Sequence, residues 1–256
     1  MRRFVVLVCL CFAALSAFAQ TAPAPPKMTW VRYYQVERGK SMEFMQLARE
    51  QFKPLLDALK KDGKIVDWGL AIPITQTEEP WTHLIFIAMP DWSGAEAIDQ
   101  AIDKAEAAMT PELAKKQGSL SMSIGGMRDV ILRHIVQSAT EPKAQPKYIV
   151  GDVYKIKAGR EGDAVQLFNE WGKPLFTDLA AKGSVDIWGL STHGVPGAAE
   201  WTHMVWYFLH DLGDMEKVIQ ANESMEPRKM QGYAVRLRDM SEWNGPREQV
   251  WRLMTP

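Results

Sequence analysis

Apolar and polar residues follow two different periods along this chain, one typical of helices and one typical of strands. Over residues 41–61, apolar side chains recur at spacings of three and four, which predicts a helix with one buried stripe. Residues 30–36 and 65–72 are rich in aromatic and β-branched residues and are predicted to be strands. The pattern continues with a strand over 81–89, a helix over 93–109 and a strand over 128–136. The first half therefore predicts the order β-α-β-β-α-β.

The second half of the chain repeats the first at an offset of 120 residues, without a gap. The triplet Trp-Gly-Leu occurs at 68–70 and 188–190, and Trp-Thr-His occurs at 81–83 and 201–203. Two tryptophan-containing triplets at one offset indicate a duplicated unit. Its strands are expected over 148–156, 185–191, 201–209 and 247–254, and its helices over 161–182 and 212–224.

A proline lies inside the first predicted helix of each copy, at Pro54 and Pro174. Because an interior proline removes a backbone hydrogen bond and clashes with the preceding turn, we expect a kink or a break at both positions. Gly63 and Gly183 follow lysines where these helices end, and we expect them to form left-handed caps.

The first nineteen residues have the three parts of a secretory signal peptide. Arg2 and Arg3 precede an apolar run over 4–12, and a small-x-small cleavage site follows at 17–19. Lipidation is the weaker alternative, since neither cysteine lies in a lipobox-like pattern. Cleavage would remove both cysteines, so the mature chain would have no disulfide and no membrane span. We therefore expect a periplasmic or secreted protein.

The composition of residues 20–256 indicates two units and gives no sign of a nucleic-acid partner. A spacer rich in proline and alanine (20–27) and a linker (137–146) delimit repeat 1 (28–136) and repeat 2 (147–256). With 30 basic and 31 acidic residues, the formal net charge of −1 gives no sign of a nucleic-acid partner.

The predicted fold class is α+β, with two tandem ferredoxin-like β-α-β-β-α-β units. The strands over 81–89 and 201–209 are apolar on both faces, which favours two antiparallel sheets that pack on each other as an intramolecular pseudo-dimer. The mid-helix proline, the Trp-Gly strand and the Trp-Thr-His strand together resemble the dimeric α/β-barrel superfamily, which includes NIPSNAP-like proteins and antibiotic-biosynthesis-type monooxygenases. The resemblance implies helices outside a barrel and a cavity between the sheets. It implies no single activity, because the fold hosts oxygenases, haem enzymes, isomerases and proteins of unassigned function.

His83 and His203 are the candidate catalytic residues. Strand alternation predicts that they share a face with Trp81 and Trp201, which would set an imidazole beside an indole in each half. If that face lines the cavity, desolvation would lower the imidazole pKa and suit it to general-base work. The alternative is a pair of histidines that serve only the packing of the core.

The candidate ligand-binding residues are mostly aromatic. They are Trp81, Trp201, Trp68, Trp188, Arg32, Tyr34 and Tyr154. These rings either wall a cavity for a flat apolar molecule or fill the space between the sheets. Arg32 corresponds to Asp152 in the second copy, so an ion pair across the barrel is expected.

No metal site or cofactor is predicted. The histidine of each Trp-Thr-His triplet has no further ligands at metal-binding spacing, and no phosphate loop or nucleophilic serine elbow occurs. The leading hypothesis is an exported protein that binds a small, largely apolar or aromatic molecule in a barrel cavity. One alternative is a cofactor-independent oxygenase or isomerase with His83 or His203 as the base. The other is a structural or interaction module with a filled barrel.

Overall fold

The computed structural model describes residues 25–75, 79–138, 145–195, 200–243 and 245–254. The expected signal peptide and most of the expected spacer and linker lie outside the described residues. Within the described ranges, no helix is long and apolar enough to span a membrane.

The elements of the two halves follow the same order. The first half contains β1 (Met28–Val36), α2 (Ser41–Leu47), η2 (Ala48–Phe52), α3 (Lys53–Lys61), β2 (Asp67–Pro73), β3 (His83–Met89), α4 (Trp92–Ala107), α5 (Pro111–Ser121) and β4 (Ile124–Gln137). The second half contains β5 (Tyr148–Tyr154), α6 (Glu161–Leu167), η3 (Phe168–Gly172), α7 (Lys173–Ala181), β6 (Trp188–His193), β7 (His203–Leu209), α8 (Gly213–Glu223), α9 (Pro227–Met240) and β8 (Arg247–Met254). Helices α5 and α9 were not predicted, although each begins with a proline in its first turn.

All eight strands form one closed antiparallel barrel in the order β1-β3-β2-β8-β5-β7-β6-β4. The predicted fold class, two ferredoxin-like units whose separate sheets face each other, is therefore wrong. The halves are joined edge to edge through backbone pairing of β2 with β8 and of β4 with β6. Separate sheets would leave the N–H and C=O groups of four edge strands without partners, and closure pairs them.

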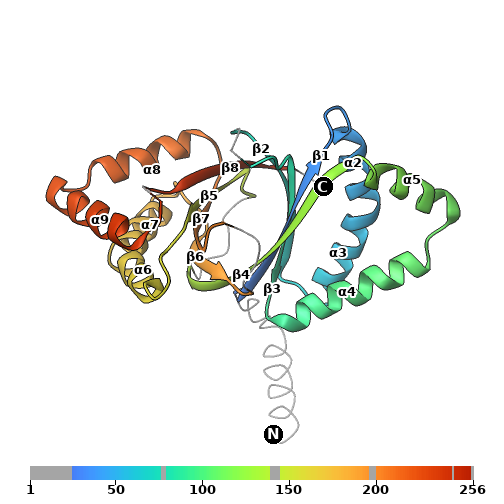
Figure 1. The fold of residues 1–256 in the computed structure, drawn as a ribbon, viewed down its shortest axis with the longest axis horizontal. Helices are drawn as coiled ribbons and strands as arrows, with labels where there is room; N and C mark the ends of the chain where they lie inside the picture. The colour runs from blue at the N-terminus through green and yellow to red at the C-terminus, as the bar shows by residue number, and fades with distance from the viewer. Residues whose placement is uncertain (1–24, 76–78, 139–144, 196–199, 244, 255–256) are drawn as a thin grey trace, which may run out of the picture.

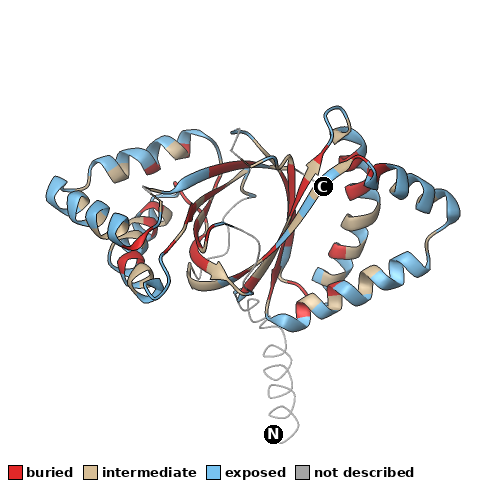
Figure 2. Ribbon diagram, viewed as in Figure 1, coloured by how far each residue is buried: buried red, intermediate tan, exposed pale blue. Residues whose placement is uncertain are grey.

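Closure also explains why the strands are apolar on both faces. One face of each strand meets the barrel interior, where rings and aliphatic side chains from both halves form one cluster. The other face meets helices, and each half has its own cluster there. The helices of the two halves cover opposite sides of the barrel (Figure 1). Buried residues accordingly concentrate on the strands and on the helix faces turned toward them (Figure 2).

The break expected at each proline takes the form of a π-helical turn directly before it. The turns η2 and η3 precede Pro54 and Pro174, which occupy the first turns of α3 and α7. A wider turn relieves the clash between the proline ring and the preceding carbonyl groups. Gly63 and Gly183 have φ angles of 67° and 74°, so the predicted left-handed caps are confirmed.

A substitution at the β4–β6 seam tests how tightly the barrel closes. A Cβ at Gly189 would lie 2.6 Å from the Trp206 ring and 2.8 Å from the Val136 carbonyl oxygen. We expect Gly189→Ala to lower the free energy of unfolding by about 1–3 kcal/mol, measured by urea denaturation. Gly232→Ala, on an open face of α9 with nothing within 4 Å, is the control and should raise it by roughly 0.5–1 kcal/mol. Equal effects would contradict this account of the seam.

Candidate functional site

The predicted site residues do not gather in one place. Trp81 and Trp201 belong to the cluster inside the barrel, whereas His83 and His203 face the helices. The expected shared face is wrong because Trp81 and Trp201 precede the strands β3 and β7, where regular alternation has not begun. Trp188 packs on the helix side in the second half, stacked on Phe176 at 6.1 Å between ring centroids.

In the first half, the environment of His83 is closed. The Ser41 hydroxyl lies 2.8 Å from Nε2, and the Phe44 ring lies 4.7 Å from the imidazole centroid. Tyr34 packs on the same Phe44 ring at 4.9 Å. Trp68 is buried nearby and donates its indole N–H to Asp57 at 2.9 Å. Burial lowers the pKa of His83 to about 4, so this imidazole is neutral near pH 7.

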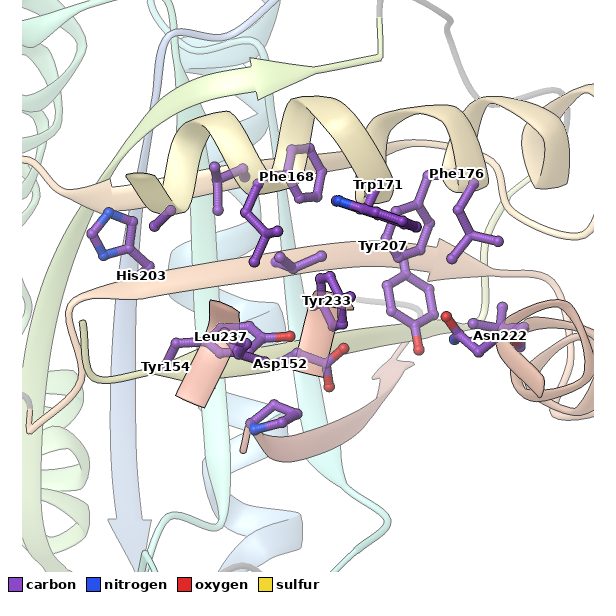
Figure 3. A pocket seen from close by; sticks show the side chains of 18 of the residues that line it. Asp152, Tyr154, Phe168, Trp171, Phe176, His203, Tyr207, Asn222, Tyr233 and Leu237 are labelled. Carbon is purple, nitrogen blue, oxygen red and sulfur yellow. Dashed lines mark hydrogen bonds between the residues drawn. The ribbon is translucent and has the colours of Figure 1, made fainter. Parts of the chain in front are cut away.

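In the second half, a cavity of about 380 Å³ lies between the helix-facing side of the sheet and the helices. Figure 3 shows Phe168, Trp171 and Phe176 on the helix above it and Asp152 and Tyr154 on a strand below it. The aromatic lining comprises Tyr154, Phe168, Trp171, Phe176, Tyr207 and Tyr233, and the polar lining comprises Asp152, His203, Asn222 and Glu248. The volume and the mostly apolar wall are typical of a small-molecule site.

Two smaller residues help to open this cavity. At an offset of 120 residues, Ala164 takes the position of Phe44 and Gly172 takes the position of Phe52. Gly172 also lets the Phe168 ring approach its backbone, because a Cβ there would lie 2.5 Å from that ring. Ala164 and Gly172 are therefore two positions where the second half has less side-chain volume than the first.

His203 lies in the wall of the cavity, and its hydrogen bonds indicate its tautomer. The Thr202 hydroxyl donates to the Tyr154 carbonyl oxygen at 3.3 Å, accepts the Ile156 N–H at 2.9 Å and lies 2.9 Å from His203 Nδ1. Because that hydroxyl has one hydrogen, Nδ1 must carry the proton in the neutral ring, and Nε2 has a free lone pair. Within the described residues, no hydrogen-bond partner meets Nε2. In the first half, the Ser41 hydroxyl is the hydrogen-bond partner of His83 Nε2, and Glu161 takes the position of Ser41 in the second half. Burial lowers the pKa of His203, so the ring is neutral near pH 7.

The expected ion pair between Arg32 and Asp152 does not form. Arg32 instead holds Asp129 on the neighbouring strand, with Nε and Nη2 donating to the carboxylate at 2.6 and 2.9 Å. The Trp30 indole donates to the same carboxylate at 2.8 Å. This pair belongs to the first half alone and lies on its partly exposed sheet face.

The second half carries two acids in place of that ion pair. Asp152 takes the position of Arg32, and its register partner on β8 is Glu248, as Asp129 is the partner of Arg32 on β4. Asp152 is half-buried in the cavity wall, and Glu248 lies at the exposed edge. Burial, with Glu248 nearby, raises the pKa of Asp152 to about 7, and burial also raises the pKa of Glu248.

Tyrosine hydroxyl groups surround this pair of acids. Tyr154, Tyr207 and Tyr233 line the cavity with Asp152, and burial raises the pKa of all three phenols. The cavity therefore contains one carboxyl group that is half-ionised at neutral pH, neutral phenols and a neutral imidazole. Within the described residues, no group of three histidine, cysteine or acidic side chains is arranged to hold a metal ion.

By sequence, the chain matches no family model and no curated protein. By structure, it is similar to a candidate monooxygenase from Fusobacterium nucleatum, with a TM-score of 0.59, 10% identity and coverage of 91% of this chain and 94% of that one. It is also similar to a candidate monooxygenase from Lactobacillus acidophilus, with a TM-score of 0.54, 11% identity and coverage of 90% of this chain and 93% of that one. The chain has the dimeric α/β-barrel fold. A third similar structure is an anthrone oxidase-like protein, with a TM-score of 0.51, 10% identity and coverage of 89% of this chain and 91% of that one.

Of the predicted site residues, the cavity includes His203 and Tyr154. The roles predicted for them, and for Trp81, Trp201, Trp68, Trp188, Arg32, Tyr34 and His83, stay predictions. Asp152 entered the sequence analysis only as a partner for Arg32, and Glu248 was missed. The sequence did contain one signal for these acids. At the position where the first copy has Arg32, the second copy has the oppositely charged Asp152.

Filling the cavity with the residue that closes the first half should abolish binding of an apolar probe. We expect Ala164→Phe to remove most of the fluorescence enhancement of N-phenyl-1-naphthylamine and to raise the free energy of unfolding by roughly 0.5–2 kcal/mol. Met42→Phe, at an exposed position of α2, is the control and should leave the probe signal unchanged. An undiminished signal in Ala164→Phe would show that the probe binds elsewhere.

Proposed function

We propose that this chain is a cofactor-independent oxygenase that deprotonates a small aromatic substrate in the cavity of its second half. The observation that carries the proposal is the Asp152 carboxyl group, set in a largely apolar, aromatic wall beside a second acid. A general base is most effective when its pKa lies near the working pH, and the pKa of Asp152 is raised to about 7.

The cavity fits a flat substrate of two or three rings. Its volume of about 380 Å³ lies in the range of small-molecule sites. Phe168 and Trp171 approach from the helix and Tyr207 from the sheet (Figure 3), so aromatic faces are available on both sides of a planar molecule. His203 Nε2 would accept a hydrogen bond from a substrate hydroxyl group and orient it toward Asp152.

The proposed chemistry needs only dioxygen as the co-reactant. Asp152 removes a proton from an acidic C–H group of the substrate, and the electron-rich carbanion is then oxidised by O₂. For a methylene group between two aromatic rings, the carbanion and O₂ form a C–O bond and give a peroxide. Loss of the second C–H hydrogen then breaks the O–O bond, so the CH₂ group becomes C=O and the outer oxygen leaves as water. The proton held by Asp152 returns to the departing oxygen, so the base is regenerated. Glu248, at the mouth, would exchange protons with solvent.

The similarity to candidate monooxygenases and to an anthrone oxidase-like protein supports this proposal at the level of the fold. The earlier hypothesis that His203 is the base remains open to the same test. A rate controlled by Asp152 should change near pH 7, whereas one controlled by His203 should change at lower pH, because burial lowers the pKa of His203.

Anthrone under air is the first substrate to test, with oxygen uptake and anthraquinone absorbance as the two readouts. We expect kcat/KM to rise with pH through about 7 and to level above it, as Asp152 ionises. Asp152→Asn should lower the rate by roughly 10²–10⁴-fold, since a positioned base contributes about that much. Asp178→Asn, at an exposed residue of α7 paired with Lys182, is the control. Probe binding without oxygen uptake on any aromatic substrate would indicate a binding protein and contradict the oxygenase.

The same residue should cost the protein stability at neutral pH. An unfolded aspartate titrates near pH 4 and the folded one near 7, so over this window the unfolded chain releases a proton that the folded chain keeps. Stability should therefore fall as pH rises from about 4 to 7. We expect Asp152→Asn to be more stable than the parent at pH 8, because it removes a partly buried charge. The gain should be only roughly 1–2 kcal/mol, because the half-exposed carboxylate is partly screened by solvent. Chemical denaturation at pH 4 and pH 8 checks this, and a difference that does not grow with pH would contradict it.

A further inference from the structure

A second group of polar side chains lies on the opposite side of the sheet, inside the barrel. Arg128 on β4 forms a two-pronged ion pair with Glu79, with Nη1 and Nη2 donating at 3.1 and 2.8 Å. The guanidinium group contacts two neighbouring aromatic rings, at 5.0 Å from the Tyr33 centroid and 4.9 Å from the Trp81 centroid. Each terminal nitrogen uses one N–H group on Glu79, and the single N–H group of Nε is buried without a partner among the described residues.

Five buried polar atoms around Arg128 have no hydrogen-bond partner within the described part of the chain. They are Arg128 Nε, Trp81 Nε1, Trp201 Nε1, His193 Nε2 and Gln249 Oε1. Trp201 and Gln249 are more than nine-tenths buried, with exposures of 1% and 4%. A buried polar atom without a partner is costly, so five in one neighbourhood call for a bound molecule that satisfies them.

These side chains are close neighbours. Trp81 is stacked on Arg128, and the Gln249 amide nitrogen lies 3.4 Å from the Glu79 carboxylate that Arg128 holds. The His193 ring lies 4.4 Å from the Trp201 ring, centroid to centroid. Burial and the positive charge of Arg128 lower the pKa of His193, which agrees with their proximity.

Whether each unpartnered atom donates or accepts a hydrogen bond determines which ligand could satisfy it. Indole and guanidinium N–H groups can only donate, so Trp81, Trp201 and Arg128 need an acceptor. Gln249 Oε1 can only accept, so it needs a donor, and His193 Nε2 can take either role. Glu79 balances the charge of Arg128 and burial keeps His193 neutral, so a ligand with net charge would remain uncompensated there.

We propose that the barrel interior holds a second small-molecule site that takes a neutral amide group. The amide oxygen accepts hydrogen bonds from the indoles of Trp81 and Trp201 and from Arg128 Nε, and the amide N–H₂ donates to Gln249. This site is separated from the Asp152 cavity by the sheet itself and does not depend on the proposed oxygenase activity.

The test uses the full chain with ¹⁵N-labelled tryptophan, in which each indole N–H gives one NMR signal. Trp81→Phe and Trp201→Phe assign the two signals of interest. Acetamide is the probe, and acetate, which has nearly the same shape but carries a charge, is the matched control. We expect acetamide to move both signals downfield and saturably, with a Kd roughly in the millimolar range for so small a ligand. Acetate should have little effect.

Trp68 and Trp206 are internal controls, because their indoles already donate to Asp57 and Ser191. Their signals should not move, and their unchanged positions in each variant report that the chain is folded. Trp81 is half-buried, so Trp81→Phe is the milder change and should by itself weaken the response of the Trp201 signal at least tenfold in Kd. If the Trp81 and Trp201 signals do not shift when acetamide is added, the site holds water alone and the proposal is wrong. Equal responses to acetamide and acetate would overturn the amide assignment.

Discussion

Edge-to-edge pairing of β2 with β8 and of β4 with β6 is the constraint on which the other features of the molecule depend. Each strand in a closed barrel has one face turned inward and one turned outward, so closure assigns every strand side chain to one of two environments. Arg128 and Trp201 belong to the inner environment, and Asp152 and His203 belong to the outer one. The two groups of polar residues therefore lie on opposite sides of the sheet, and β8 contributes Gln249 to one and Glu248 to the other.

The two halves differ in how their helix-facing sides are filled. In the first half, Phe44 and Ser41 close the environment of His83, and Asp129 satisfies Arg32. In the second half, Ala164 takes the position of Phe44 and Glu161 that of Ser41, and Asp152 lies beside a second acid, Glu248, in the wall of the cavity. The cavity and the neighbouring acids cost stability. One well-packed half can stabilise a chain whose other half tolerates that cost, because the barrel joins them into a single structure.

The sequence predicted what local patterns determine and missed what depends on distant pairing. The helix over 41–61, the glycine caps and the strand over 247–254 follow from residues near one another in the chain. Barrel closure depends on strands that are more than a hundred residues apart, and no local pattern encodes it. The position of His83 and His203 on the helix side was missed because the regular alternation of β3 and β7 does not extend back to Trp81 and Trp201. The cavity itself was readable only by comparing copies at Ala164 and Gly172.

The π-helical turns have a consequence for insertions and deletions. A π turn holds one more residue than the α-helical turn it replaces, so each of these helices contains one residue that a regular helix would not need. Deleting one residue from η3 would restore regular α-helical geometry without rotating α6 relative to α7, because the residue lost is the extra one. The extra residue therefore changes the spacing of side chains only within the turn, where Phe168 and Trp171 line the cavity.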